Sequence, residues 1–209
     1  MGDTLQPPAG WAGATGVRLA VPPPSSQGLL FRTAASFSGL FGRQQVPDIF
    51  LVMHRSARLF WPWLFFASRL MPFGRLPATL REKIILRTAW NCRSRYEWGQ
   101  HVDIGLNAGV QDAEIVAIAQ GPAAFADRGE RALIQACDDV CQQQCISDAS
   151  WHILAEHYDD GMLVEIILLI GHYQMVAGFL NSTGIVLEPV IEEKLQAFYR
   201  RVAGLPSAA

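Results

Sequence analysis

The chain has 209 residues, which is long enough for one domain with a substantial hydrophobic core. Hydrophobic residues make up 50% of it and charged residues 17%, and so apolar a composition favours burial of some surface between subunits of a homo-oligomer. The formal net charge of −2 gives no electrostatic basis for binding nucleic acid.

Cysteine usage and the absence of obvious targeting signals favour a cytoplasmic, soluble protein. Four cysteines are too few for a disulfide framework in a chain of this length. The N-terminal residues lack the basic start and apolar run of a secretion signal. The stretch 163–180 is long enough to span a membrane, but it contains Glu165, His172 and Gln174, which favour a helix buried in protein instead.

Two parts of the chain differ in composition. Residues 1–27 are rich in proline, glycine and serine, which predicts a flexible N-terminal arm, either mobile or draped over the rest. Residues 28–205 carry apolar residues at helical spacing and no alternating strand pattern, which predicts a single all-α domain.

The helix boundaries follow from prolines at first turns, polar capping residues and glycines after last turns. Gly109 is expected to end its helix in the left-handed conformation, and polar residues 91–95 are expected to separate two helices. The predicted helices, in chain order, are 29–41, 47–54, 57–71, 77–90, 96–107, 111–120, 128–144, 148–158, 161–181 and 188–202.

The candidate chemistry lies in residues 81–110. Glu97 and His101 are four residues apart, so a helix projects both side chains from one face, and Glu82 lies in the preceding helix. A carboxylate beside an imidazole is a minimal acid/base pair, because each group tunes the pKa of the other. The spacing by itself is more typical of a surface contact than of catalysis, and the wider pattern of the segment changes that interpretation.

That pattern combines Arg81-Glu82 at the start of an apolar helix, the run YEWGQH at 96–101 and the run AGV at 108–110. It resembles the carboxymuconolactone decarboxylase family and its relatives, the alkyl hydroperoxidase D-like proteins. The resemblance is strongest over residues 76–120 and extends more loosely over 46–188. It implies the all-α fold of that family, assembly into a trimer or hexamer, and small pockets near subunit contacts.

The sequence departs from the peroxidase branch of these relatives at the two redox cysteines. Glu82 and His101 stand at positions that match the relatives, but the cysteine positions hold Ser94 and Glu97. Cys92 comes two residues too early and has no cysteine three residues on. A dithiol reaction needs a nucleophilic and a resolving thiol at one site, so this reading excludes a dithiol peroxidase of the usual pattern.

The resemblance assigns catalysis to His101, Glu97 and Glu82. Each has an alternative role that the residues alone leave open. His101 could be a helix histidine hydrogen-bonded for structural reasons, Glu97 could be an exposed partner of Arg93, and Glu82 could be a first-turn carboxylate favoured by the helix dipole.

Further residues are candidates for binding substrate. A tyrosine or serine hydroxyl can donate a hydrogen bond, an arginine can hold a carboxylate through two parallel bonds, and a histidine within an apolar helix can line a pocket or belong to the core. These candidates are Tyr96, Ser94, Arg87 and His172.

No metal site is expected. Cys137, Cys141 and Cys145 form one stripe of a helix, but a straight helix spreads their sulfurs over about 12 Å, too far to bind a single ion. The resemblance, together with the acid/base residues, implies a cofactor-free acid/base enzyme acting on a small carboxylated or lactone-type molecule. A non-catalytic ligand-binding oligomer is the alternative, and a peroxide-related redox protein is a more distant one.

Overall fold

The computed structural model describes residues 5–23 and 46–204, and this part of the chain is helical with no strand. The helix predicted at 29–41 lies outside the described residues. The helices are α2 (Asp48–Met53), α3 (Ala57–Leu70), α4 (Ala78–Asn91), α5 (Arg95–Ala108), α6 (Asp112–Gln120), α7 (Arg128–Gln143), α8 (Asp148–His157), α9 (Asp160–Thr183) and α10 (Pro189–Val202), with short 3-10 turns at His54–Ser56 and Pro122–Ala124.

Helix ends agree with the predicted ones because the capping residues act as expected. Gly109 ends α5 with φ 101°, a left-handed conformation that costs glycine little. The side chain of Ser147 accepts a hydrogen bond from the Ser150 amide at the start of α8. Gln111 and Glu114 form a reciprocal capping box at the start of α6. The all-α prediction is confirmed.

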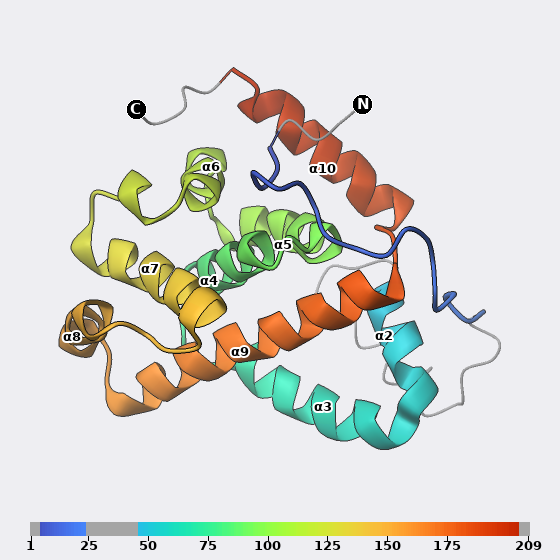
Figure 1. Cartoon of the computed structure of the whole chain (residues 1–209), viewed down its shortest axis with the longest axis horizontal. Coiled ribbons are helices and arrows are strands. Elements are labelled where there is room, and N and C mark those ends of the chain that lie inside the picture. Colours follow the sequence, from blue (N-terminus) through green and yellow to red (C-terminus); the bar gives the residue numbers. More distant parts are fainter. Residues whose placement is uncertain (1–4, 24–45, 205–209) are drawn as a thin grey trace.

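Helix α4 lies at the centre of the fold. It packs against α5, α6, α7 and α9, and Figure 1 shows it enclosed by them. Every residue from Arg81 to Trp90 is buried, so the helix has no solvent face. Sequence periodicity suggests one apolar side formed by Ile84, Ile85, Ala89 and Trp90, which understates this burial.

The buried charged residues of α4 are paired with groups of opposite charge, which makes their burial possible. The Lys83 ammonium contacts the carboxylates of Glu114, at 2.6 Å, and Glu130. The Arg87 guanidinium makes two parallel bonds to Asp138, Nε to Oδ1 at 2.6 Å and Nη2 to Oδ2 at 2.8 Å. These pairs remove the cost of burying a lone charge and fix the position of α4 against α6 and α7.

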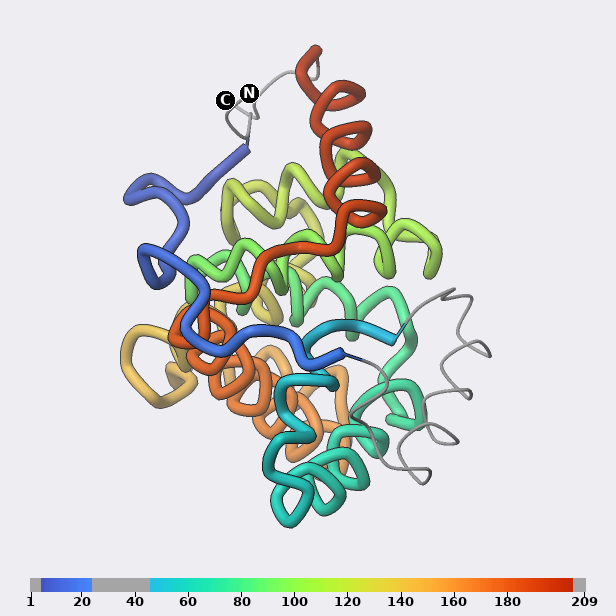
Figure 2. Tube along the Cα trace, turned by 90° about the vertical axis from the view of Figure 1, so that its right-hand side faces the viewer, coloured from blue at the N-terminus to red at the C-terminus, as the bar shows by residue number. Residues whose placement is uncertain are grey.

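Residues 5–23 lie along the surface as an extended arm, blue in Figure 2. The amides of Ala12 and Ala14 donate to the carbonyls of Arg93 and Asn181 at 2.8 and 2.9 Å. The ring of Trp11 packs against those of Trp90 and Trp98, with centroids 5.7 and 6.1 Å apart. The arm thus joins the α4–α5 turn to the end of α9.

Helix α9 is the only helix in the described part that is long and apolar enough to cross a membrane, and 50% of that apolar stretch is buried inside the protein. Its outer face leaves apolar side chains exposed beside α3, which packs against it. These exposed side chains are Val164, Ile167, Leu168 and Met175 of α9 and Phe65 and Phe66 of α3.

Candidate functional site

Glu82 and His101 meet across the α4–α5 hairpin. The Nδ1 atom of His101 lies 2.7 Å from Oε2 of Glu82, and the two residues are 6% and 0% exposed. The Arg81 guanidinium donates to the other oxygen, Oε1, at 3.3 Å. Because a carboxylate only accepts hydrogen bonds, Nδ1 carries the proton and Nε2 is left to exchange one.

A row of aromatic side chains from α9 and α3 begins at the imidazole. The ring of Tyr173 meets that of His101 edge to face, with centroids 5.0 Å apart. Tyr173 in turn contacts His172 at 5.3 Å, and His172 stacks on Trp63 at 5.8 Å with planes 15° apart. The Glu82–His101 pair therefore lies in an environment of low polarity, where a proton-transfer group is less solvated than in water.

His172 belongs to this aromatic row and is uncharged at neutral pH. Its Nδ1 atom is buried without a hydrogen-bond partner. Burial lowers the pKa of the imidazole from 6.5 to about 4, because charging it there would cost solvation. The geometry gives His172 a packing role beside Tyr173.

The low pKa of His172 predicts a loss of stability in mild acid. Between pH 6.5 and 4 the unfolded chain binds a proton at this residue that the folded chain does not, so folding free energy is lost as pH falls through that window. At about 1.4 kcal/mol per pKa unit the full loss is about 3 kcal/mol. Replacing His172 by Phe, which keeps the ring stack, is expected to reduce the loss of unfolding free energy between pH 7.5 and pH 4.5, measured by urea unfolding at both pH values. An equal loss in the wild type and the variant would contradict the assignment.

Glu97 is the most isolated ionisable group of the site. It is 2% exposed, and neither carboxyl oxygen has a hydrogen-bond partner. Burial, followed by the charge of nearby Cys141, raises its pKa well above 4.5, so the carboxyl holds its proton at neutral pH. Arg93, its expected surface partner, instead donates to the Ala9 carbonyl at 3.1 Å.

Glu97 predicts a pH dependence of the opposite sign. Above pH 4.5 the unfolded chain releases a proton that the folded chain keeps, so stability falls as pH rises towards the folded pKa. One such group contributes a slope of at most about 1.4 kcal/mol per pH unit. The Glu97→Gln variant is expected to gain stability over the wild type between pH 5.5 and 7.5, measured by urea unfolding. A difference between the two proteins that stays constant with pH would refute the buried neutral carboxyl.

Of the predicted substrate-binding residues, His172 lies near His101 through Tyr173, whereas Tyr96 and Arg87 have other partners. The hydroxyl of Tyr96 donates to Glu188 at 2.7 Å on another side of α5. Arg87 is held by Asp138 and by the carbonyls of Ile118, at 2.7 Å, and Ala119, at 3.3 Å. The donor groups of its guanidinium are therefore already hydrogen-bonded, which disfavours binding of a substrate carboxylate.

Ser94 lies at the N-cap position of α5, between the two helices that carry the site. Its hydroxyl is buried and without a partner. An unpaired buried hydroxyl costs free energy, so a group that accepts or donates a hydrogen bond there would be stabilised.

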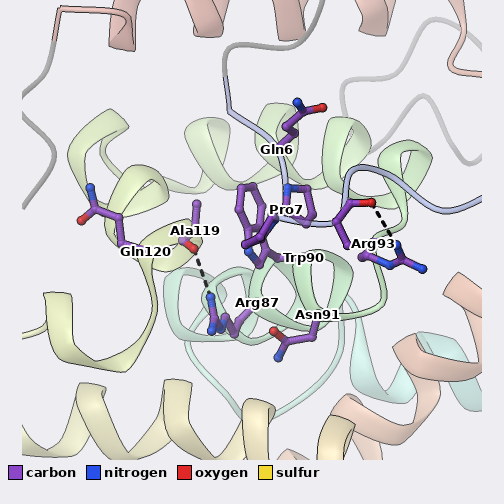
Figure 3. Close-up of a pocket in the computed structure, with 10 residues that line it drawn as sticks. Gln6, Pro7, Arg87, Trp90, Asn91, Arg93, Ala119 and Gln120 are labelled. Atoms are coloured by element: carbon purple, nitrogen blue, oxygen red, sulfur yellow. Dashed lines mark hydrogen bonds between the residues drawn. The ribbon is translucent and has the colours of Figure 1, made fainter.

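Two cavities lie beside these residues. The larger, about 530 Å³, is open to solvent and is lined by the arm at Gln6–Ala9, the C-terminal end of α4 and the end of α6 (Figure 3), with Arg87, Trp90 and Asn91 in its wall. The smaller, about 140 Å³, lies between the arm, Tyr96 and the end of α9. Neither is lined by Glu82, Glu97 or His101, so the acid/base pair and the larger cavity are at different places on α4.

Sequence reasoning missed a contact between two cysteines. Cys92 follows α4 directly, and its thiol hydrogen-bonds that of Cys141 on α7, next to Glu97. Cys137 is buried in the core on α7, whereas Cys145 is exposed and lies beyond the end of α7 at Gln143, so the three cysteines predicted on one helix stripe do not share one helix. No local spacing could have revealed the pair, because its members lie on different helices.

Comparison with known proteins agrees with this fold. Residues 57–139 match the model of the carboxymuconolactone decarboxylase family. No curated protein matches the sequence. An alkylhydroperoxidase AhpD core, an uncharacterized peroxidase-related protein from Ralstonia eutropha, superimposes with a TM-score of 0.74 at 18% identity, over 86% of this chain and 96% of that one.

Two further solved structures have the same fold. The debrominase Bmp8 in complex with 2,3,4-tribromopyrrole has a TM-score of 0.74 at 14% identity, over 88% of this chain and 99% of that one. An uncharacterized peroxidase-related protein from a Silicibacter species has a TM-score of 0.71 at 14% identity, over 88% and 97% of the two chains. The resemblance seen in the sequence is confirmed: the chain has the alkylhydroperoxidase D fold, and its residues 57–139 match the model of the carboxymuconolactone decarboxylase family.

Proposed function

We propose that the chain is a cofactor-free acid/base enzyme acting on a small carboxylated or lactone-type organic molecule. The observation that carries the proposal is the buried 2.7 Å hydrogen bond between Glu82 and His101. Glu82 fixes the tautomer and orientation of the imidazole, and Nε2 exchanges the proton with substrate. This arrangement is the geometry that general acid/base catalysis requires.

A decarboxylation on this site would proceed in two steps. Loss of carbon dioxide leaves an electron-rich carbon, and a protonated His101 delivers the proton that this carbon needs. Glu97, one turn earlier on α5 and neutral, is a second proton donor on the same helix. The apolar surroundings favour loss of the substrate carboxylate by desolvating it. Isomerisation, dehydration and lactone hydrolysis need the same groups.

The residues at the motif favour proton transfer over thiol chemistry there, since Ser94 and Glu97 stand where the peroxidase branch has cysteines. Exposed apolar side chains on α9 and α3 support self-association as a trimer or hexamer, and such a contact would lie near the aromatic row beside His101. We place the enzyme in the cytoplasm, in keeping with its free thiols.

The direct test is a substrate survey with the purified full chain. 4-Carboxymuconolactone, a set of β-keto acids and a set of enol-lactones are incubated with protein, and carbon dioxide release and loss of substrate absorbance are followed. Turnover of at least one member is expected, without added metal or cofactor. No turnover of any member would contradict the proposed substrate class.

A ligand-binding role is favoured by one observation, the separation of the 530 Å³ cavity from the acid/base pair. A binding protein needs such a cavity and does not need His101. Calorimetric titration of the same compounds into wild-type protein and into the Trp90→Ala variant separates the two roles. Binding without turnover that is weakened by the Trp90 change identifies a binding protein.

A further inference from the structure

The end of α4 and the middle of α7 are held in a fixed register. Arg87 and Asn91, one turn apart on α4, both bind Asp138, with Asn91 Nδ2 to Asp138 Oδ1 at 2.7 Å. Cys92 follows Asn91 directly, and Cys141 lies one turn beyond Asp138. This polar clamp therefore sets the two cysteines opposite each other across the α4–α7 contact.

The two thiols interact in an unequal way. Cys141 accepts a hydrogen bond from the thiol of Cys92 and another from the Asn91 amide, and these bonds lower the pKa of Cys141. The same contact, with burial, raises the pKa of the Cys92 thiol. Both cysteines are free and partly exposed. The pKa of Cys141 is thus the lower of the two, which favours Cys141 over Cys92 as the nucleophile.

Glu97 completes the surroundings of the pair. Its buried carboxyl interacts with both thiols and has no hydrogen-bond partner. Because burial keeps this carboxyl protonated, it places no negative charge next to a Cys141 thiolate. A charged carboxylate at this position would instead repel the thiolate.

We propose that Cys92 and Cys141 form a dithiol redox site that exchanges with a small disulfide, with Cys141 as the attacking and Cys92 as the resolving cysteine. These two cysteines are not the Cys-x-x-Cys motif of the peroxidase branch, whose positions are taken by Ser94 and Glu97 in this chain. Within the described residues, no hydrogen bond joins Cys92 or Cys141 to Glu82 or His101.

The exchange has two steps that balance. The Cys141 thiolate attacks one sulfur of a small disulfide RSSR, forming a mixed disulfide with R and releasing RS⁻, which takes a proton from water. The Cys92 thiol then loses its proton and attacks the Cys141 sulfur, and the second RS⁻ leaves with that proton. Counted from the two thiols, the protein loses two hydrogen atoms, that is two electrons and two protons, and RSSR becomes two RSH.

The test uses the full chain with Cys145 replaced by Ser, so that the exposed thiol cannot react. Glutathione disulfide is the probe, and intact mass and peptide mapping are the readouts. The expected product lacks two hydrogen atoms, carries no glutathione and yields a Cys92–Cys141 cross-linked peptide. Adding Cys92→Ser should trap one glutathione on Cys141, and adding Cys141→Ser should leave Cys92 unmodified.

The outcomes separate this site from the acid/base chemistry. The His101→Asn variant should form the cross-link at the wild-type rate, because the assay needs no turnover. Stable glutathionylation of the parent protein without a Cys92–Cys141 peptide would overturn the proposal. Reaction at Cys92 when Cys141 is replaced by Ser would overturn the assigned order of attack.

Discussion

The His101→Asn variant is expected to lower kcat/KM by about 10²–10⁴-fold for any compound that the wild type converts, which is the usual contribution of a positioned proton-transfer group. Asparagine can retain the hydrogen bond to Glu82, so the buried carboxylate keeps a partner, but it cannot exchange a proton through a ring nitrogen. The initial rate of carbon dioxide release or lactone loss at saturating and sub-saturating substrate is the measurement.

The matched control is His152→Asn. His152 is exposed on α8, where its Nδ1 contacts the Asp148 carbonyl at 2.6 Å, and it takes no part in the site. This variant should keep the wild-type rate. Thermal unfolding and sedimentation show whether each variant keeps its fold and assembly. An unchanged rate in a folded His101→Asn protein would remove His101 from the mechanism.

The Arg87→Leu variant is expected to lose about 3–5 kcal/mol of unfolding free energy, the typical cost of leaving one partner of a buried ion pair without its countercharge. Asp138 would lose both guanidinium bonds, and the carbonyls of Ile118 and Ala119 would lose their donor. Urea unfolding at pH 7 measures the loss.

Arg201→Leu provides the comparison. Arg201 pairs with Asp112 through two bonds of 2.8 and 2.9 Å, but its side chain is 49% exposed. Exposed pairs of this kind contribute about 0.2–1 kcal/mol. If Arg87→Leu costs no more than Arg201→Leu, the clamp does not hold α4 to α7. Replacing Asp138 by Leu together with Arg87 should recover part of the loss, because no unpaired charge remains.

Most helices were predictable from the sequence because their ends carry local signals. Glycine at 109, the capping pair at 111 and 114 and the serine at 147 act within one turn of themselves. The course of the arm was not predictable. It depends on hydrogen bonds to Arg93 and Asn181 and on the packing of Trp11, which involve residues far along the chain.

Only part of the candidate site was predictable from the sequence. The pairing of Glu82 with His101 followed from a resemblance, and the structure adds the distance and the burial that a spacing cannot provide. Arg87 looked like a substrate-binding arginine, because the sequence does not reveal that Asp138 lies opposite it. The Cys92–Cys141 contact was not predictable for the same reason, because it depends on how α4 packs against α7.

The central claim is that Glu82 and His101 act as one catalytic unit, and a double-mutant cycle on kcat/KM tests it most directly. Glu82→Gln, His101→Asn and the double variant are compared with the wild type on a substrate that it converts. Residues that act as a unit are strongly non-additive, so the double variant should be about as slow as the slower single variant. A double variant slowed by the product of the two single effects, or single variants at the wild-type rate, would contradict the account.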